Sequence, residues 1–462
     1  MKKTVLFFIL LSLIFTSSSF AAIDPRLAPN NKVGINSLSP AAEIGDSSTL
    51  VNTNGDWGYV VVTISKNEMD INRWQSFLDK ANDHHLIPII RLATEFDAAN
   101  GYWKKPTDTD AQNWANFLSK LYFPTQNRYI QIYNEVNRAA EWGGQVDPDS
   151  YAKELDKTIN ALKAKSSDFF VLNAPLDLSL INSKNSADPS DFLDEMEQSD
   201  PGIFTKLDGW ASHSYPNPGF SASPYLSGKT GIDGYSWELS KIASYAGSKD
   251  LPVFITETGW KRAVNGINGL SEDQISDYYK EAFTDIWSDK RVVAVAPFLL
   301  NYPESLFSQF SFKSQDSKNS GYLKYFNTIR DMPKIKGAPQ RENLASDLQI
   351  FIPNFFINST GSFVTVDFKN TGNYIWDPKK DLSIKILGGK INSYYVYWDK
   401  GSVYPGEDIR AIIIIENYSQ EMVPFAIEIK DDGKILGQKV VYVSSQTAFS
   451  LLMQKLKSIF RS

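Results

Sequence analysis

Eight short apolar runs alternate with helix-like segments up to residue 330, and this alternation restricts the fold more than any other feature. Each run is continuously apolar, as in strands that are buried on both faces of a parallel sheet. Between most of the runs, apolar residues recur every three or four positions, which predicts amphipathic helices. The predicted strands are residues 32–37, 57–64, 87–93, 128–137, 169–175, 207–215, 251–260 and 292–300.

A parallel (β/α)8 barrel, the TIM-barrel architecture, explains this pattern better than an open doubly wound sheet. No glycine-rich phosphate-binding loop follows the first strand, which also counts against a dinucleotide-binding fold. We therefore predict an α/β fold in which residues 23–330 form a catalytic barrel. In such a barrel the strands end at a common mouth, and the side chains there carry the chemistry.

The sequence changes character after residue 330. Prolines, a glycine and several charges over residues 331–345 predict a linker. Residues 346–444 contain seven strand-like runs separated by turn signals, the pattern of an all-β sandwich. Within them the segment FKNTGNYIW, residues 368–376, resembles an edge found in several immunoglobulin-like accessory domains. We therefore expect an immunoglobulin-like sandwich behind the barrel.

The two ends of the chain differ in composition from the segments between them. Two lysines, an apolar stretch and small residues predict a cleaved signal peptide over residues 1–22. Its apolar stretch is short for an ordinary membrane-spanning helix, and an uncleaved anchor is the alternative. We expect a secreted, periplasmic or cell-surface protein. At the other end, residues 445–462 predict a short amphipathic helix. Through residues 447–462 it either contacts a membrane or cell surface, packs on the sandwich, or frays.

Two of the predicted strands end in a glutamate. Asn134 and Glu135 close the fourth strand in RYIQIYNEVN, and Glu257 closes the seventh in LPVFITETGW. Because the strand ends meet at one mouth, we expect the two carboxyl groups to converge. Hydrolysis of a glycosidic bond requires such a pair. One carboxyl group protonates the leaving oxygen, and the other stabilises the positive charge that develops at the anomeric carbon.

With Asn-Glu on the fourth strand and Glu on the seventh, residues 31–330 resemble the large clan of retaining glycoside hydrolases built on this barrel. The resemblance implies Glu135 as general acid/base, Glu257 as nucleophile, and Asn134 as a donor to the substrate 2-hydroxyl. The segment ITETGW is similar to the nucleophile strand of members that act on β-1,3-glucans and galactans. The family within the clan stays open.

Other polar residues at strand ends are expected to serve the two glutamates. Arg91 closes the third strand, and His213 and Tyr215 close the sixth, so all three are candidate donors to Glu257. A structural ion pair for Arg91, or a core position for His213, is the alternative. For Glu135 to act as an acid, we expect burial and the charge of Glu257 to raise its pKa.

Aromatic residues on loops that follow strands are candidates for stacking on a sugar ring. Many members of the clan carry a tryptophan at the end of the eighth strand, where this chain has Phe298 and Tyr302. Glu141 and Asp97 lie on loops of the same side and are candidate subsite residues. The further aromatic candidates are Trp260, Trp142, Trp103 and Tyr102.

The composition excludes several other functions. A net charge of −6 without a basic tract argues against nucleic-acid binding. The chain has no cysteine and three histidines, so we expect neither a disulfide nor a metal site, and no cofactor. The expected partner is an oligo- or polysaccharide. Two rivals stay open: a non-catalytic surface protein that binds glycan, and a transglycosidase that uses the same glutamates.

Overall fold

The computed structural model describes residues 22–247, 249–264, 266–302, 304, 306–314, 321–341, 351–358, 361–369, 377–386, 393–403, 407–416, 423–431 and 434–443. Residues 1–21 of the predicted signal peptide and the whole predicted C-terminal helix lie outside these ranges. Within the described residues, no helix combines the length and apolarity needed to cross a bilayer.

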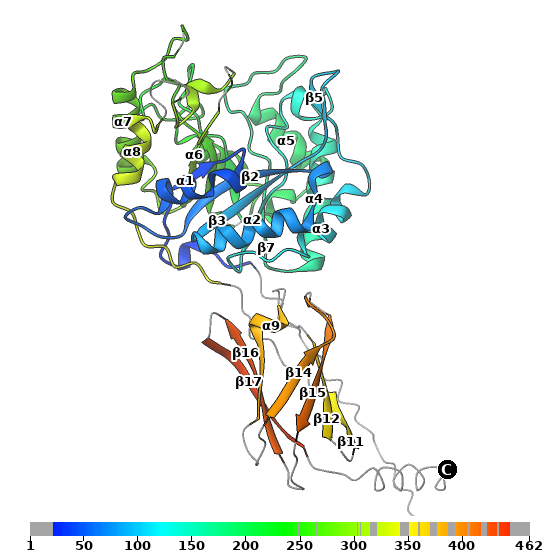
Figure 1. Ribbon diagram of the computed structural model, residues 1–462. Coiled ribbons are helices and arrows are strands. Elements are labelled where there is room, and N and C mark those ends of the chain that lie inside the picture. The colour runs from blue at the N-terminus through cyan, green and yellow to red at the C-terminus, as the bar shows by residue number, and fades with distance from the viewer. Residues whose placement is uncertain are drawn as a thin grey trace, which may run out of the picture.

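Eight parallel strands build two sheets in the first part of the chain (Figure 1). Five of them pair in the order β1-β2-β3-β6-β7, and three pair in the order β10-β9-β8. Each of the eight predicted strands is present, although the sixth is reduced to three residues. Their bounds are β1 Gly34–Asn36, β2 Gly58–Ser65, β3 Leu86–Ala93, β6 Arg128–Gln131, β7 Phe169–Leu172, β8 Trp210–Ser212, β9 Val253–Thr258 and β10 Val292–Pro297.

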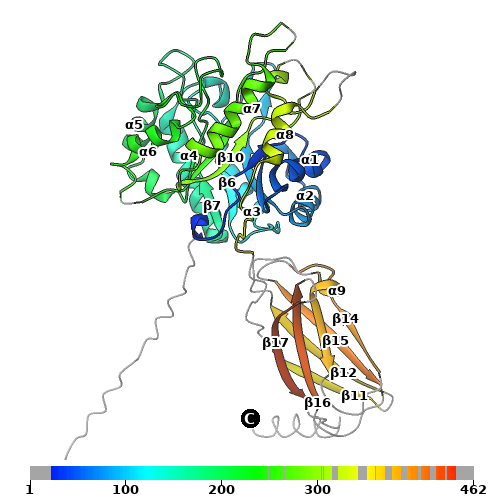
Figure 2. The same cartoon turned by 90° about the vertical axis from the view of Figure 1, so that its left-hand side faces the viewer.

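Helices lie around the outside of these sheets (Figures 1 and 2). Ser271 and Gln274 form a capping box at the start of α7. The helices are α1 Pro40–Asn52, α2 Ile71–Asp83, α3 Asp110–Leu118, α4 Pro148–Lys165, α5 Pro189–Ser199, α6 Gly234–Ile242, α7 Glu272–Glu281 and α8 Lys324–Asp331. Shorter elements are η1 Pro25–Leu27, η2 Lys66–Glu68, β4 Phe96–Asp97, β5 Tyr102–Trp103, η3 Ala139–Glu141, η4 Ile203–Lys206, the π-helix η5 Ala282–Ile286 and η6 Ser308–Phe310.

Alternate residues of strands such as β2 enter two different cores. In β2, Val60 and Val62 belong to the core between sheet and helices, whereas Tyr59 and Val61 belong to an inner core between the sheets. Aromatic rings join the sheets across this inner core. Phe254 of β9 contacts Tyr59 of β2, with ring centres 6.3 Å apart. Burial on both faces explains why the strands are apolar without interruption.

Buried asparagine side chains join the edges of the two sheets. Isolated backbone bridges mark the two edges, Val33 with Val295 at one and Leu172 with Gly209 and Asp177 with His213 at the other, and no continuous ladder crosses either edge within the described residues. At the β7 edge, Asn173 Oδ1 accepts a hydrogen bond from Ala211 N over 2.8 Å, and its Nδ2 donates to Ala211 O over 3.1 Å. These side-chain bonds replace the missing ladder bonds.

Asn36 bridges the other edge of the sheets. Its Nδ2 donates to Thr256 O of β9 over 2.8 Å and to Ala296 O of β10 over 3.1 Å. Because Asn36 ends β1, its side chain ties the first strand to the last two. Asparagines at the carboxyl ends of β1 and β7 therefore hold both edges at the end of the sheets where the predicted site lies.

The first part of the predicted linker is bonded to the sheets. Gly337 N donates to Asp56 O over 3.0 Å, and Gln126 N donates to Gln340 O over 2.8 Å. Residues 332–340 therefore follow the surface at the amino ends of the strands, and a linker over residues 331–345 stays a prediction.

Seven antiparallel strands follow residue 350 and form two sheets (Figure 2). The first sheet has the order β11-β12-β15-β14 and the second β13-β16-β17. All seven predicted strands are present. They are β11 Phe351–Asn358, β12 Gly361–Lys369, β13 Leu382–Ile386, β14 Ser393–Trp398, β15 Asp408–Glu416, β16 Val423–Asp431 and β17 Lys434–Val443, with the short helix α9 Pro378–Asp381 before β13. Most of the FKNTGNYIW segment lies outside the described residues.

Candidate active site

The two predicted glutamates lie together at the carboxyl ends of the strands. Glu135 follows β6 of the five-stranded sheet, and Glu257 lies in β9 of the three-stranded sheet. His213, which follows β8, lies between them. One atom from each of these three side chains falls within 4.8 Å of the other two. His213 Nδ1 lies 2.9 Å from Glu135 Oε1 and 3.8 Å from Glu257 Oε2.

Glu257 is buried and held by two donors. Arg91 Nη1 donates to its Oε1 over 2.8 Å, and the Tyr215 hydroxyl donates to its Oε2 over 3.1 Å. Arg91 is itself fixed, because its Nε donates to Thr63 Oγ1 over 2.9 Å and its Nη1 to Asn134 Oδ1 over 3.0 Å. These contacts fix the positions of both carboxylate oxygens of Glu257.

Tyr215 supplies its proton as a neutral phenol. Burial and the charge of Glu257 raise the pKa of Tyr215 well above its ordinary value. Burial acts to lower the pKa of His213, but the charges of Glu257 and Glu135 outweigh burial and raise it. His213 therefore gains positive character beside two carboxylates.

Glu135 stands on a backbone conformation that is uncommon for residues with a side chain. Its φ is +34°, and its N–H donates to Pro175 O over 2.9 Å. Its carboxylate contacts two cationic groups: His213 at Oε1, and Arg138 Nε at Oε2 over 2.9 Å. Such strained positions persist only where the surroundings hold them, and they occur often at active sites.

The expected raised pKa of Glu135 is wrong for the free protein. Burial acts to raise this pKa, but the hydrogen bond from His213 and the charges of His213, Arg138 and Arg91 outweigh burial and lower it. Sequence reasoning included the charge of Glu257 and missed Arg138. The available signal was its position, three residues after Glu135 on the same strand-end loop.

A third carboxyl group, Glu141, borders the same site. Burial and the charges of Glu135 and Glu257 raise the pKa of Glu141 to about 7, whereas Arg91 and a hydrogen bond with Asn134 act in the opposite direction. Glu141 belongs to η3, on the loop between β6 and α4. The site therefore holds one carboxyl group that is neutral in mildly acidic solution. Asp97, another candidate, is instead bonded to Asn100 in its own turn.

Glu135, His213 and Glu257 could ligate a divalent cation, but their side chains already contact other groups of the protein. Glu135, His213 and Glu257 offer the ligand types that divalent cations accept. His213 and the Arg138 guanidinium contact Glu135, and donors from Arg91 and Tyr215 contact Glu257. A cation there would lie beside two guanidinium charges.

Trp142 and Trp260 are not sugar platforms, and this part of the prediction is wrong. Trp142 is 1% exposed and Trp260 is 2% exposed. The Trp142 ring lies between Tyr133 and Tyr151, and Trp260 Nε1 donates to Ala222 O over 2.8 Å. Both tryptophans lie near the predicted mouth, but their rings face the core.

Other aromatic candidates remain partly exposed. The Tyr302 ring contacts Phe307 with centres 5.3 Å apart, and Phe307 in turn contacts Phe298 at 5.4 Å. Phe310 connects Phe298 to Tyr215, with ring centres 6.1 and 6.4 Å away. These five rings form a continuous aromatic row that begins at Tyr215, which contacts Glu257, and ends at Tyr302. Tyr102 and Trp103 of β5 are also partly exposed.

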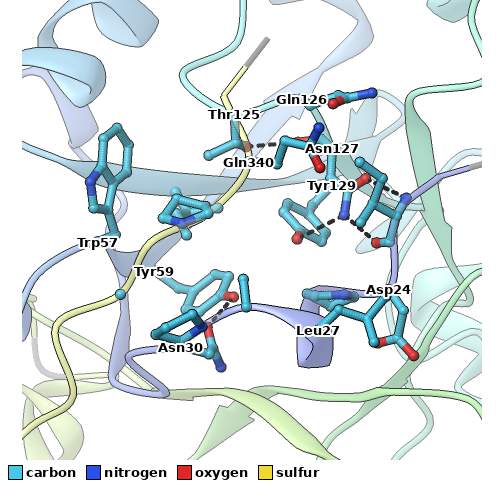
Figure 3. A pocket seen from close by; sticks show the side chains of 17 residues that line it. Asp24, Leu27, Asn30, Trp57, Tyr59, Thr125, Gln126, Asn127, Tyr129 and Gln340 are labelled. Atoms are coloured by element: carbon cyan, nitrogen blue, oxygen red, sulfur yellow. Dashed lines mark hydrogen bonds between the residues drawn. The ribbon is translucent and has the colours of Figure 1, made fainter. Parts of the chain in front are cut away.

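A separate cavity of about 190 Å³ lies at the amino ends of β2, β3 and β6, away from the glutamates (Figure 3). The Tyr59 hydroxyl donates to Asn30 Oδ1 over 2.7 Å, and Asn127 Nδ2 donates to the Tyr129 hydroxyl over 3.1 Å. Since its polar groups bond to one another, the cavity offers no free set of donors comparable to the strand-end site.

No family model matches the sequence, and a comparison with curated proteins finds no match. Solved structures that resemble the chain include a family 39 glycoside hydrolase from Bacteroides cellulosilyticus. Its TM-score is 0.46 and its identity 12%, with 86% of this chain and 82% of that chain covered. A β-mannanase from Thermomonospora fusca has a TM-score of 0.40 and 13% identity, covering 65% of this chain and 90% of its own. A β-glucuronidase from Bifidobacterium dentium has a TM-score of 0.39 and 12% identity, covering 66% and 46%.

Proposed function

We propose that this protein is an exported glycoside hydrolase that cleaves a β-linked glycan with retention of configuration. Glu257 is the nucleophile, Glu135 the general acid/base, and Asn134 a contact to the substrate. The observation that carries the proposal is the approach of the two carboxylates to within 4.8 Å. Retaining enzymes place these groups about 5–5.5 Å apart, whereas inverting enzymes leave about 6.5–9.5 Å for a water molecule.

The reaction proceeds in two displacements. In the first, a Glu257 oxygen bonds to the anomeric carbon, the bond from that carbon to the leaving oxygen breaks, and protonated Glu135 gives its proton to the leaving oxygen. In the second, ionised Glu135 takes a proton from water, the water oxygen bonds to the anomeric carbon, and the bond to Glu257 breaks. Arg91 and Tyr215 hold Glu257 in place for attack in the first displacement. In the second, they stabilise the Glu257 carboxylate as it leaves the anomeric carbon.

We also propose a barrel fold for the first domain, an immunoglobulin-like fold for the later strands, and export of the protein. The two parallel sheets, bridged at both edges, fit a (β/α)8 barrel with the site at its mouth. The order of the seven later strands, first-second-fifth-fourth and third-sixth-seventh, is that of a constant-type immunoglobulin domain. The signal-like residues 1–22 support export.

Product stereochemistry and nucleophile rescue test this function together. Proton NMR of a fresh digest is expected to show the β-anomer first. Glu257→Ala is expected to abolish turnover of an activated aryl β-glycoside, with azide restoring part of it as a glycosyl azide. Unchanged turnover in this variant would remove Glu257 from the mechanism, and an initial α-product would replace the nucleophile by a base that activates water.

Two rivals give other outcomes in the same assays. A non-catalytic glycan-binding protein would bind oligosaccharide in calorimetry and release no product over days. A transglycosidase would pass the glycosyl group to an added sugar acceptor faster than to water. A panel of β-glucans, galactans, mannans and aryl glycosides identifies the sugar.

A further inference from the structure

We propose that Arg138 and Asp177 form a charge pair that decides how readily Glu135 holds its proton, which makes Arg138 a positioning residue for the reaction. This inference rests on the proposed function. It concerns two residues that sequence reasoning did not single out. Arg138 follows Glu135 by three positions, and Asp177 lies on the loop after β7.

Arg138 connects the two carboxylates directly. Its Nε lies 2.9 Å from Glu135 Oε2, and its Nη2 contacts Asp177 Oδ2. The Arg138 side chain is 41% exposed, compared with 17% for Glu135 and 11% for Asp177. The guanidinium charge is therefore divided between two less exposed carboxylates at the rim of the site.

Asp177 is held rigidly, so it can anchor the arginine. Its N–H donates to Asn137 Oδ1 over 3.1 Å, and Asn137 Nδ2 donates back to Asp177 O over 3.0 Å. The Ser179 hydroxyl and N–H both donate to Asp177 Oδ1, over 2.6 and 2.9 Å. Because Oδ1 is already occupied, Oδ2 is left for Arg138.

The pair acts on the balance between the two displacements. Glu135 must carry a proton in the first displacement and must lack one in the second. Arg138 stabilises the carboxylate, which favours the second. Asp177 neutralises part of the positive charge of Arg138, so Glu135 can still take up the proton that it needs in the first displacement. The two residues should therefore act on the proton of Glu135 in opposite directions.

Other charged groups also face Glu135, and they stay unchanged when Arg138 or Asp177 is replaced. They come from four other segments of the chain: His213, Arg91, Glu257, Glu141 and Tyr215. Since these groups are common to every variant below, a difference between variants reports the pair itself.

The test compares pH profiles of kcat/KM for Arg138→Gln, Asp177→Asn and Arg138→Lys, with Arg73→Gln as a matched control. Arg73 of α2 is exposed and pairs with Glu68, and neither residue is among the groups that contact Glu135. The substrate is an unactivated disaccharide, whose leaving group needs the proton of Glu135. We expect the basic limb to move up by about one pH unit in Arg138→Gln and down in Asp177→Asn, with Arg138→Lys near wild type.

Opposite shifts of the basic limb in Arg138→Gln and Asp177→Asn support the charge pair. A merely structural role would lower activity in both variants and leave the basic limb of each pH profile in place. Shifts in the same direction, or no shift, would overturn it. Should Asp177→Asn not fold, the upward shift of Arg138→Gln and its reversal by lysine decide alone. Turnover of a dinitrophenyl glycoside, which needs no acid, is measured in parallel. If the wild type does not hydrolyse the dinitrophenyl glycoside at all, the proposed function itself is refuted.

Discussion

Arg91 and Glu257 form an ion pair between the two parallel sheets, with 2.8 Å separating Nη1 from Oε1. Arg91 comes from β3 and Glu257 from β9, so the pair exists only when the sheets are assembled. The same guanidinium contacts Asn134 on the strand of the other glutamate. The arginine thus ties Glu257 to the strand end that carries Glu135.

Replacement of Arg91 should therefore reduce catalysis more than it reduces stability. A hydrogen bond to a charged group contributes about 1.5–3 kcal/mol, so Arg91→Gln is expected to lower kcat/KM roughly 10- to 100-fold. Arg91→Lys keeps the charge and should retain more activity. Steady-state kinetics and urea unfolding measured on the same preparations separate the two effects. A purely structural ion pair would lower the unfolding midpoint and leave kcat/KM of the folded fraction unchanged.

Replacement of Glu135 and replacement of Glu141 should affect proton donation to the leaving group to different extents. Glu135→Gln should slow hydrolysis of substrates with poor leaving groups by about 10²–10⁴-fold. Glu141→Gln should slow it much less, and it should remove an ionisation near pH 7 from the profile, since the pKa of Glu141 is raised to about 7. The reverse ranking of the two variants would make Glu141 the acid.

Glu238 of α6 should make stability fall as the pH rises. Its side chain is fully buried beside Trp210 and Ser212, and burial raises the pKa of Glu238 to about 8 from 4.5. Below pH 4.5 both folded and unfolded states are protonated. Between pH 4.5 and 8 only the folded state keeps the proton, so stability declines by on the order of 4 kcal/mol and then levels off.

Urea unfolding at pH 5 and pH 8 checks this sign. Glu238→Gln keeps the neutral shape, so it should match the wild type at pH 5 and exceed it at pH 8. The exposed residue Glu195 of α5 provides the control Glu195→Gln, which should follow the wild type at both values. Equal stability of the wild type and Glu238→Gln at pH 8 would contradict the prediction.

Asn173 should be essential for joining the two sheets. Asn173→Ala leaves Ala211 N and O without their side-chain partner, and each buried unpaired group costs about 1–3 kcal/mol. We expect a loss of about 3 kcal/mol in the free energy of unfolding, measured by urea denaturation. Asn160→Ala on the exposed face of α4 should change it by no more than about 0.5 kcal/mol. A similar small change at both positions would show that the edge does not depend on Asn173.

Local pattern was sufficient for most elements and failed where it is weak. Sequence reasoning did not predict α1, in which Gly45 and the Ser47-Ser48-Thr49 run are poor helix formers. It also did not predict α5, although Asp188 caps that helix and Phe192 and Met196 are buried from it. Strands were easier to predict because burial on both faces makes them apolar without interruption.

Exposure of single aromatic residues could not be predicted. Trp142 and Trp260 occupy strand-end loops, as predicted, yet each ring is enclosed by aromatic neighbours of the outer core. Sequence position places a residue near the mouth, but the rotation of its side chain depends on what packs there. Tyr302 lies on a similar loop and remains partly exposed.

The sequence by itself determined the positions of the eight parallel strands, the seven later strands and the two glutamates that end their strands, because apolar periodicity and strand ends are local properties. Only the tertiary structure decided the charge state of the site. His213 lies 78 positions from Glu135, and Arg91 lies 166 positions from Glu257, yet each pair is in contact. Proton affinity depends on the charges and burial around a group in space, and these are set when the two sheets come together.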